Sequence, residues 1–124
     1  MSDINDNLFL ICGKSAVGKS ASLMNLKNPE GVVYLNCEAG KKLPFRSKFN
    51  ELTVTDPYQV EDAFQQVEEM EDVHTIVIDS LHYLMAMYES LHVLTATSTM
   101  QAWGEYTQFF KRLMQQHVAS SSKN

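Results

Sequence analysis

One glycine-rich motif restricts the fold of this chain more than any other feature of its sequence. Residues 13–20 read GKSAVGKS, which matches the pattern GxxxxGK[ST]. The apolar run 8–12, LFLIC, comes directly before the motif, and residues 19–28 supply helix formers with Leu23 and Leu26 at helical spacing. A buried strand, a glycine loop and a helix in this order form the context in which the motif cradles phosphate.

The residue types of the motif suit a phosphate-binding loop. Glycine and other small residues let successive backbone N–H groups converge on phosphate oxygens, and the first helical turn adds its positive dipole end. We expect Lys19 to reach the β and γ phosphates and to assist catalysis, and the Ser20 hydroxyl to ligate Mg²⁺. The alternative is a glycine turn that binds nothing. The predicted nucleotide-binding residues are Gly13, Ser15, Ala16, Val17, Gly18, Lys19, Ser20 and Ala21.

Strand-like and helix-like segments alternate along the rest of the chain. Residues 31–40, 51–55 and 75–79 are predicted strands, and residues 56–70, 81–90 and 100–117 are predicted helices. We expect the segment 92–99, HVLTATST, to be a loop or a short extended piece. The pattern predicts an α/β protein, a P-loop NTPase of three α/β/α layers with a mostly parallel sheet, in one domain over residues 1–124.

Two of the predicted helices carry readable caps and apolar faces. Asp56 is the expected N-cap of the first, and Ser98 with Gln101 form a possible capping box for the last. The expected core faces consist of Val60, Phe64, Val67 and Met70 in the first helix, and of Trp103, Tyr106, Phe110, Leu113 and Met114 in the last.

Two acidic residues end predicted strands and complete a candidate site. Asp79 ends the apolar run TIVID, where a Walker B carboxylate holds magnesium, so the predicted metal ligands are Ser20 and Asp79. Glu38 lies near the end of the β-rich run 31–40, and we predict that it activates the attacking water as a catalytic residue. The alternatives are a strand-end cap for Asp79 and a surface acid for Glu38.

The charge composition limits how this domain could contact nucleic acid. A formal net charge of −5 argues against a large basic surface, so we expect any contact with nucleic acid to be local. The best candidate is the segment 40–49, where cations interleave with Phe45 and Phe49; the alternative is a solvated loop that these two rings anchor to the core. The predicted DNA-contacting residues are Lys41, Lys42, Arg46 and Lys48.

The cysteines and histidines indicate no metal cluster. Cys12 and Cys37 are expected to be buried, reduced thiols, and the four histidines have neither zinc-type spacing nor cysteine companions. The sequence shows no secretory signal pattern and no apolar run long enough to cross a bilayer, so we expect a cytoplasmic protein.

With these residues placed, the order of elements resembles the RecA-type ATPase core over nearly the whole chain. The matching segments are GKSAVGKS, VVYLNCEAG, TVTDPYQVEDAF, TIVIDSLHYL and the helix from Met100 to His117. The segments PFRSKF, DPYQVEDAF, VIDSLHYLMAMYES and AWGEYTQFF are similar, more narrowly, to small phage-encoded RecA-like ATPases of single-strand annealing and recombination.

The resemblance implies a function, cofactors and partners. It implies ATP and Mg²⁺ as cofactors, water activation by Glu38, a Walker B role for Asp79, and DNA-dependent ATP hydrolysis in DNA recombination or repair. The implied partners are single-stranded DNA, further copies of the chain or a single-strand-binding protein, in the host cytoplasm for a phage-encoded protein.

The chain departs from the family in two places. RecA-type cores continue past the last helix, so we expect a RecA-like core that is truncated at its C-terminus. Residues 89–99, which correspond to the first DNA loop of that family, contain no lysine or arginine.

Two other functions remain open at this level. A small P-loop kinase would phosphorylate a nucleotide or metabolite, although such kinases clamp phosphate with several arginines and this chain has only Arg46 and Arg112. A nucleotide-gated interaction module would bind ATP without turnover.

Overall fold

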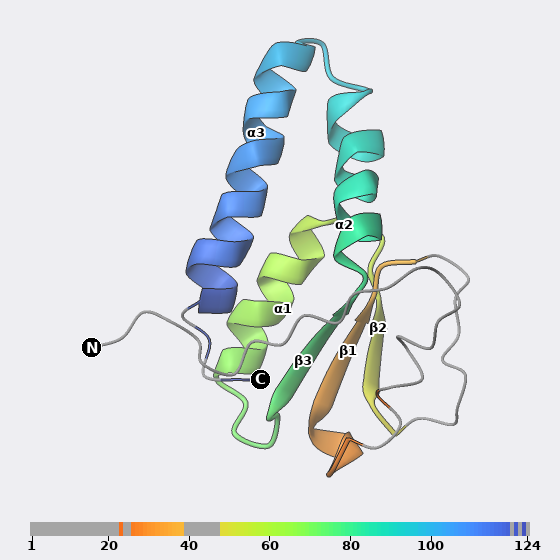
Figure 1. Ribbon diagram of the computed structural model, residues 1–124, viewed down its shortest axis with the longest axis vertical. Helices are drawn as coiled ribbons and strands as arrows, with labels where there is room; N and C mark the ends of the chain where they lie inside the picture. The colour runs from red at the N-terminus through yellow and green to blue at the C-terminus, as the bar shows by residue number, and fades with distance from the viewer. Residues whose placement is uncertain (1–22, 24–25, 39–47, 120, 122, 124) are drawn as a thin grey trace.

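The computed structural model describes residues 23, 26–38, 48–119, 121 and 123. Within these residues, a parallel sheet has the strand order β2-β1-β3 (Figure 1). The strands are β1 (Val32–Asn36), β2 (Asn50–Thr53) and β3 (Thr75–Asp79). This arrangement confirms the predicted parallel α/β sheet and three of its strands. The strand expected at residues 8–12 lies outside the described residues.

The central strand β1 is buried on both faces. A short apolar run bounded by glycines in the sequence is typical of such a strand, and its first four residues are all buried. A short 3-10 turn, η2 (Pro29–Gly31), leads into it. The register runs from Val32 opposite Thr75 to Asn36 opposite Asp79, so the carboxyl ends of β1 and β3 lie level with each other.

Helix α1 (Tyr58–Glu68) follows β2 and returns across the sheet. It begins one residue later than predicted, but the Asp56 carboxylate still caps its first turn by accepting a hydrogen bond of 3.0 Å from the Tyr58 N–H. Three of the four residues of the expected core face, Val60, Phe64 and Val67, are buried. The prediction is wrong for Met70, which is 43% exposed because the helix ends at Glu68.

Helices α2 (Leu81–Tyr88) and α3 (Thr99–Arg112) form a hairpin that extends beyond the carboxyl ends of the strands (Figure 1). Each continues into a π-helical turn, η3 (Glu89–Val93) and η4 (Leu113–Val118) respectively. The helical conformation therefore includes His92 and Val93, the first two residues of the segment 92–99 that we expected to be a loop or a short extended piece. Ser98 caps α3 by accepting from the Gln101 N–H at 3.4 Å, as predicted.

The buried face of α3 is rotated from the face that the sequence predicts. Three residues of the expected face lie against the core, since Leu113 is buried and Tyr106 and Met114 are partly buried. The prediction is wrong for Trp103 and Phe110, which are 42% and 39% exposed. The core also contacts Ala102 and Phe109, which the predicted face did not include. The apolar surface of α3 is wider than its contact, so the packing against α2 and α1 decides which part is buried.

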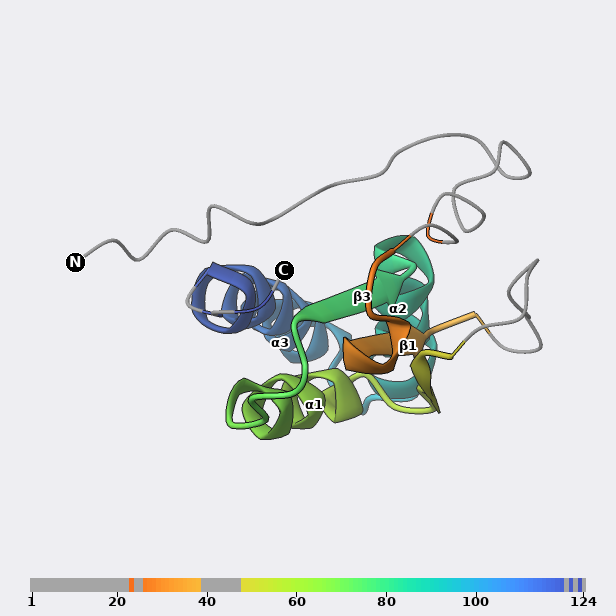
Figure 2. The same ribbon diagram turned by 90° about the horizontal axis from the view of Figure 1, so that it is seen from below.

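The two faces of the sheet have different cores. On one face, every second residue of each strand packs against the helices: Val33 and Leu35 in β1, and Ile76 and Ile78 in β3. Figure 2 shows α1 on this side of the sheet. On the opposite face a smaller cluster forms from Leu23, Val32, Tyr34 and Phe49, with Leu26 and Val77 packed against it.

Candidate functional site

The carboxyl edge of the sheet brings together the two acidic residues that the sequence singled out. Asn36 and Asp79 are paired across β1 and β3, and the Cys37 N–H extends the pairing with a 2.8 Å hydrogen bond to the Asp79 carbonyl oxygen. Glu38 is the next residue of that chain segment. Glu38, two residues past the end of β1, and Asp79, the last residue of β3, therefore lie at the same edge of the sheet, which is where ligands of open α/β sheets bind.

Asn36 controls how the chain leaves β1. Its side-chain Oδ1 accepts a hydrogen bond of 3.0 Å from the Glu38 N–H, which is a local turn typical of asparagine. Because Asn36 is held in register with Asp79, this turn sets the position of the Glu38 backbone relative to the neighbouring strand.

Asp79 has a partner that the sequence analysis missed. The buried phenol of Tyr34 donates a hydrogen bond to Oδ2 of the Asp79 carboxylate. The signal available in the sequence was the strand VVYLN. Its two polar residues, Tyr34 and Asn36, are two positions apart and so lie on the same face of an otherwise apolar run. A buried hydroxyl of this kind needs a hydrogen-bond partner.

Cys37 is a structural residue of this edge. Its side chain is 3% exposed, and its thiol lies 3.8 Å from the Leu35 carbonyl oxygen. Burial, with a smaller contribution from the Asp79 carboxylate, raises the pKa of the Cys37 thiol to about 12. The thiol is therefore protonated at neutral pH, which bears out the predicted buried, reduced cysteine; Cys12 lies outside the described residues.

Several predicted site residues lie outside the described residues. They are the whole phosphate-loop set from Gly13 to Ala21, together with Lys41, Lys42 and Arg46. Lys48 is described and exposed. Phe49 is 9% exposed and stacks on Tyr34 with ring centroids 6.2 Å apart, so for this ring the anchoring alternative is the correct one.

The donor set at the edge suits Mg²⁺. Magnesium is usually held by one or two carboxylates together with substrate phosphates and waters, and not by an all-protein cage. Asp79 supplies such a carboxylate, and within the described residues no group of three histidine, cysteine or acidic side chains forms a protein-only site. When bound, Mg²⁺ neutralises charge on the phosphate oxygens.

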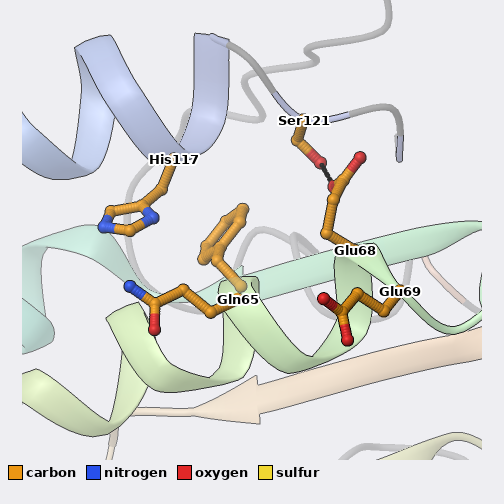
Figure 3. Close-up of a pocket in the computed structure, with 6 residues that line it drawn as sticks. Gln65, Glu68, Glu69, His117 and Ser121 are labelled. Atoms are coloured by element: carbon orange, nitrogen blue, oxygen red, sulfur yellow. Dashed lines mark hydrogen bonds between the residues drawn. The ribbon is translucent and has the colours of Figure 1, made fainter.

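A separate hollow of about 350 Å³ lies between α1 and the end of the chain (Figure 3). Its lining includes Gln65, Glu68 and His117, and the Ser121 hydroxyl donates to Glu68 at 2.9 Å. None of the predicted site residues lines it. Because α1 runs back from the carboxyl ends of the strands, its last turns lie away from the Glu38 and Asp79 edge.

This geometry is that of an open parallel α/β fold, a class of protein whose ligands bind at the carboxyl edge of the sheet. A family model described as an AAA domain matches residues 5–124, and the chain belongs to this AAA domain family. Membership indicates the P-loop NTPase fold and a nucleotide-binding ATPase that uses ATP and Mg²⁺.

The other comparisons add no relative. No significant match was found among curated proteins or among solved structures. In the described part of the chain, no helix has the length and apolar character needed to cross a bilayer.

Proposed function

We propose that this AAA domain is a RecA-like ATPase that binds Mg²⁺ and ATP at the carboxyl edge of its sheet and hydrolyses the ATP. The observation that carries the proposal is the register of Asn36 with Asp79, which brings Glu38 to the same edge as Asp79. The strand order β2-β1-β3 is also compatible with a RecA-type core, in which the strand before Glu38 lies beside the Walker B strand.

Each residue has a distinct role in this proposal. The backbone of the segment 13–20 and the Lys19 ammonium bind the phosphates, while Ser20 and Asp79 share the magnesium ion. Glu38 accepts a proton from the water whose oxygen attacks the terminal phosphorus, and ADP leaves. Glu38 is the catalytic base, so its charge matters for turnover and much less for binding.

The Arg112 side chain weighs against the kinase alternative. Its Nε donates to both carboxylate oxygens of Glu61 at 3.1 Å, and its Nη2 donates to Oε1 at 2.7 Å. This bidentate pair joins α3 to α1, and the hydrogen bond to Glu61 raises the pKa of Arg112 further. An arginine held in this way does not clamp a transferring phosphate.

The Glu38→Gln variant tests the ATPase proposal. We expect it to bind Mg²⁺-ATP with wild-type affinity in a calorimetric titration and to lose phosphate release by about 100-fold or more, since general base catalysis contributes this much. Glu51→Gln is the matched control, because Glu51 is an exposed acid in the middle of β2. Phosphate release from Glu38→Gln at the wild-type rate would remove Glu38 from the mechanism.

The wild-type protein separates the alternative functions. Tight ATP binding without any turnover would favour the interaction module, and phosphate transfer to a small acceptor would favour the kinase.

We further propose that single-stranded DNA stimulates this ATPase during recombination or annealing, in the cytoplasm of the cell. The support is the resemblance to phage-encoded RecA-like proteins and the cationic segment with the exposed Lys48. Oligomers of the chain or a single-strand-binding protein are the accompanying partners.

The salt dependence of DNA binding tests this second step. Replacing Lys41, Lys42 and Arg46 by glutamine removes three cations, so the slope of log affinity against log salt should fall by about 2. Lys111→Gln, an exposed change on α3, is the control and should leave the slope unchanged. An identical slope in the triple variant would return the segment to the role of a solvated loop.

A further inference from the structure

Tyr34 lies on the central strand of the sheet, two residue pairs away from the candidate metal ligand Asp79. It is 1% exposed and pairs in register with Val77, while Asp79 is two residues further along β3. Side chains two residues apart in a strand share a face, so Tyr34, Val77 and Asp79 all project to the same side of the sheet. The phenol reaches diagonally along this face and donates to Asp79 Oδ2.

Packing explains the ring of Tyr34 but not its hydroxyl. The ring stacks on Phe49 and fills the small cluster with Leu23 and Val32. A phenylalanine would serve that packing equally well. Burying a hydroxyl among apolar side chains is unfavourable unless it is hydrogen-bonded, and here its acceptor is a carboxylate, which makes the bond stronger than a neutral one.

We propose that Tyr34 is a positioning residue that orients the Asp79 carboxylate for Mg²⁺. The hydrogen bond to Oδ2 restricts rotation of the carboxylate about its last side-chain bond and fixes how it faces the carboxyl edge. Outer-shell partners of this kind set the orientation of a metal ligand, and their loss costs about 10- to 100-fold in metal affinity or activity. The inference rests on the proposed function, since it assigns Asp79 to magnesium.

The Tyr34→Phe variant isolates the hydroxyl because it keeps the ring. ATP binding is measured by calorimetry across a magnesium chloride titration and, separately, in EDTA. We expect the Mg²⁺ midpoint to rise about 10-fold, while metal-free ATP binding stays at the wild-type level. A residue with a purely structural role would change both titrations or neither.

Tyr58→Phe is the matched control. It also removes one tyrosine hydroxyl from a hydrogen bond, the 2.8 Å contact with Tyr88, but it does so in the helical layer that covers the opposite face of the sheet. Its Mg²⁺ midpoint should equal that of the wild type.

The outcomes separate this inference from the proposed function. A wild-type midpoint in Tyr34→Phe, with Mg²⁺-dependent ATP binding intact in the wild type, overturns the role of Tyr34 and leaves the ATPase standing. A wild-type protein that binds no ATP overturns both.

A second measurement applies if Tyr34→Phe does not fold. 3-Fluorotyrosine placed at position 34 keeps both the ring and the donor. Its fluorine resonance should shift when Mg²⁺ is added to the ATP-bound protein, whereas 3-fluorotyrosine at position 58 should not shift. An unmoved resonance at position 34 overturns the inference.

Discussion

The Glu38 N–H donates a 3.0 Å hydrogen bond to the side-chain oxygen of Asn36, so the last residue of β1 holds the acidic residue that follows the strand. The same Asn36 is paired with Asp79 on β3. Asn36 thus contacts both acidic residues of the candidate site, since it hydrogen-bonds to the Glu38 backbone and pairs with Asp79.

Removing this acceptor should impair turnover more than binding. In Asn36→Ala the Glu38 backbone loses its local anchor, and a small displacement of a catalytic base is costly, so we expect kcat to fall by about 10-fold or more. ATP affinity should change by less than about twofold, because the phosphate contacts are made elsewhere. Asn36→Ser retains a hydroxyl acceptor and should recover part of the rate. Wild-type turnover in Asn36→Ala would show that Glu38 needs no such anchor.

The phosphate loop is tested by two lysines of the same motif. Lys19→Ala should weaken ATP binding by about 10- to 100-fold, because it removes a charge-assisted contact to phosphate. Lys14→Ala has the same change in charge but lies at a variable position of the pattern, so its affinity should stay within a few fold of wild type. Equal losses in the two variants would mean that the motif attracts ATP only through general charge.

The ion pair between Arg112 and Glu61 should contribute measurably to stability. The Glu61 side chain is 14% exposed and the Arg112 side chain 36% exposed, so solvent weakens the pair relative to a fully buried one. We expect Arg112→Ala to lower the free energy of unfolding in urea by about 1–3 kcal/mol. Arg112→Lys keeps the charge but loses the bidentate fork, so its free energy of unfolding should lie between those of Arg112→Ala and the wild type. An Arg112→Ala protein as stable as the wild type would show that the ion pair contributes no net stability.

Two glycines should respond to alanine in opposite ways. A Cβ on Gly31 would lie 2.5 Å from Cδ2 of His74 and 2.9 Å from the Asp72 carbonyl oxygen. The His74 ring cannot easily move, because it hydrogen-bonds to Asn28 at 2.9 Å and to Thr75 at 2.7 Å. Overpacking of this kind costs about 1–3 kcal/mol, so Gly31→Ala should unfold at lower urea concentration.

Gly104 is the control for that substitution. It lies in α3, and no atom comes within 4 Å of the position that a Cβ would occupy, so Gly104→Ala gains helix propensity without a clash. We expect it to raise the free energy of unfolding by about 0.5–1 kcal/mol. A stabilised Gly31→Ala protein would show that Gly31 and the segment 72–74 before β3 can shift apart.

The Cys37 thiol should resist alkylation in the folded protein at pH 8, because burial raises its pKa to about 12. Between the ordinary thiol pKa and this value the folded state keeps a proton that the unfolded state loses. The contribution of Cys37 to stability is therefore complete below about pH 8.5 and declines as the pH rises toward 12. Peptide mapping after iodoacetamide treatment reports Cys37 separately from Cys12. Rapid native labelling of Cys37 at pH 8 would contradict its burial.

Local sequence patterns were enough to predict much of the fold. The apolar runs around Leu35 and Ile78, the cap at Asp56 and the spacing of Val60 and Phe64 all depend on neighbours within a few residues, and they formed strands and a helix as expected. Alternation of these elements also predicted the parallel sheet, because parallel strands need a crossover between them.

The tertiary structure decided what local patterns leave open. The apolar surface of α3 offered more than one face, and packing chose the one with Phe109 over the one with Phe110. The sequence singled out Glu38 and Asp79 separately, but the pairing of Asn36 with Asp79 and the bond from Tyr34 to Asp79 join residues more than 40 positions apart. Such contacts arise from strand register, which is fixed by burial of the whole sheet and not by any segment alone.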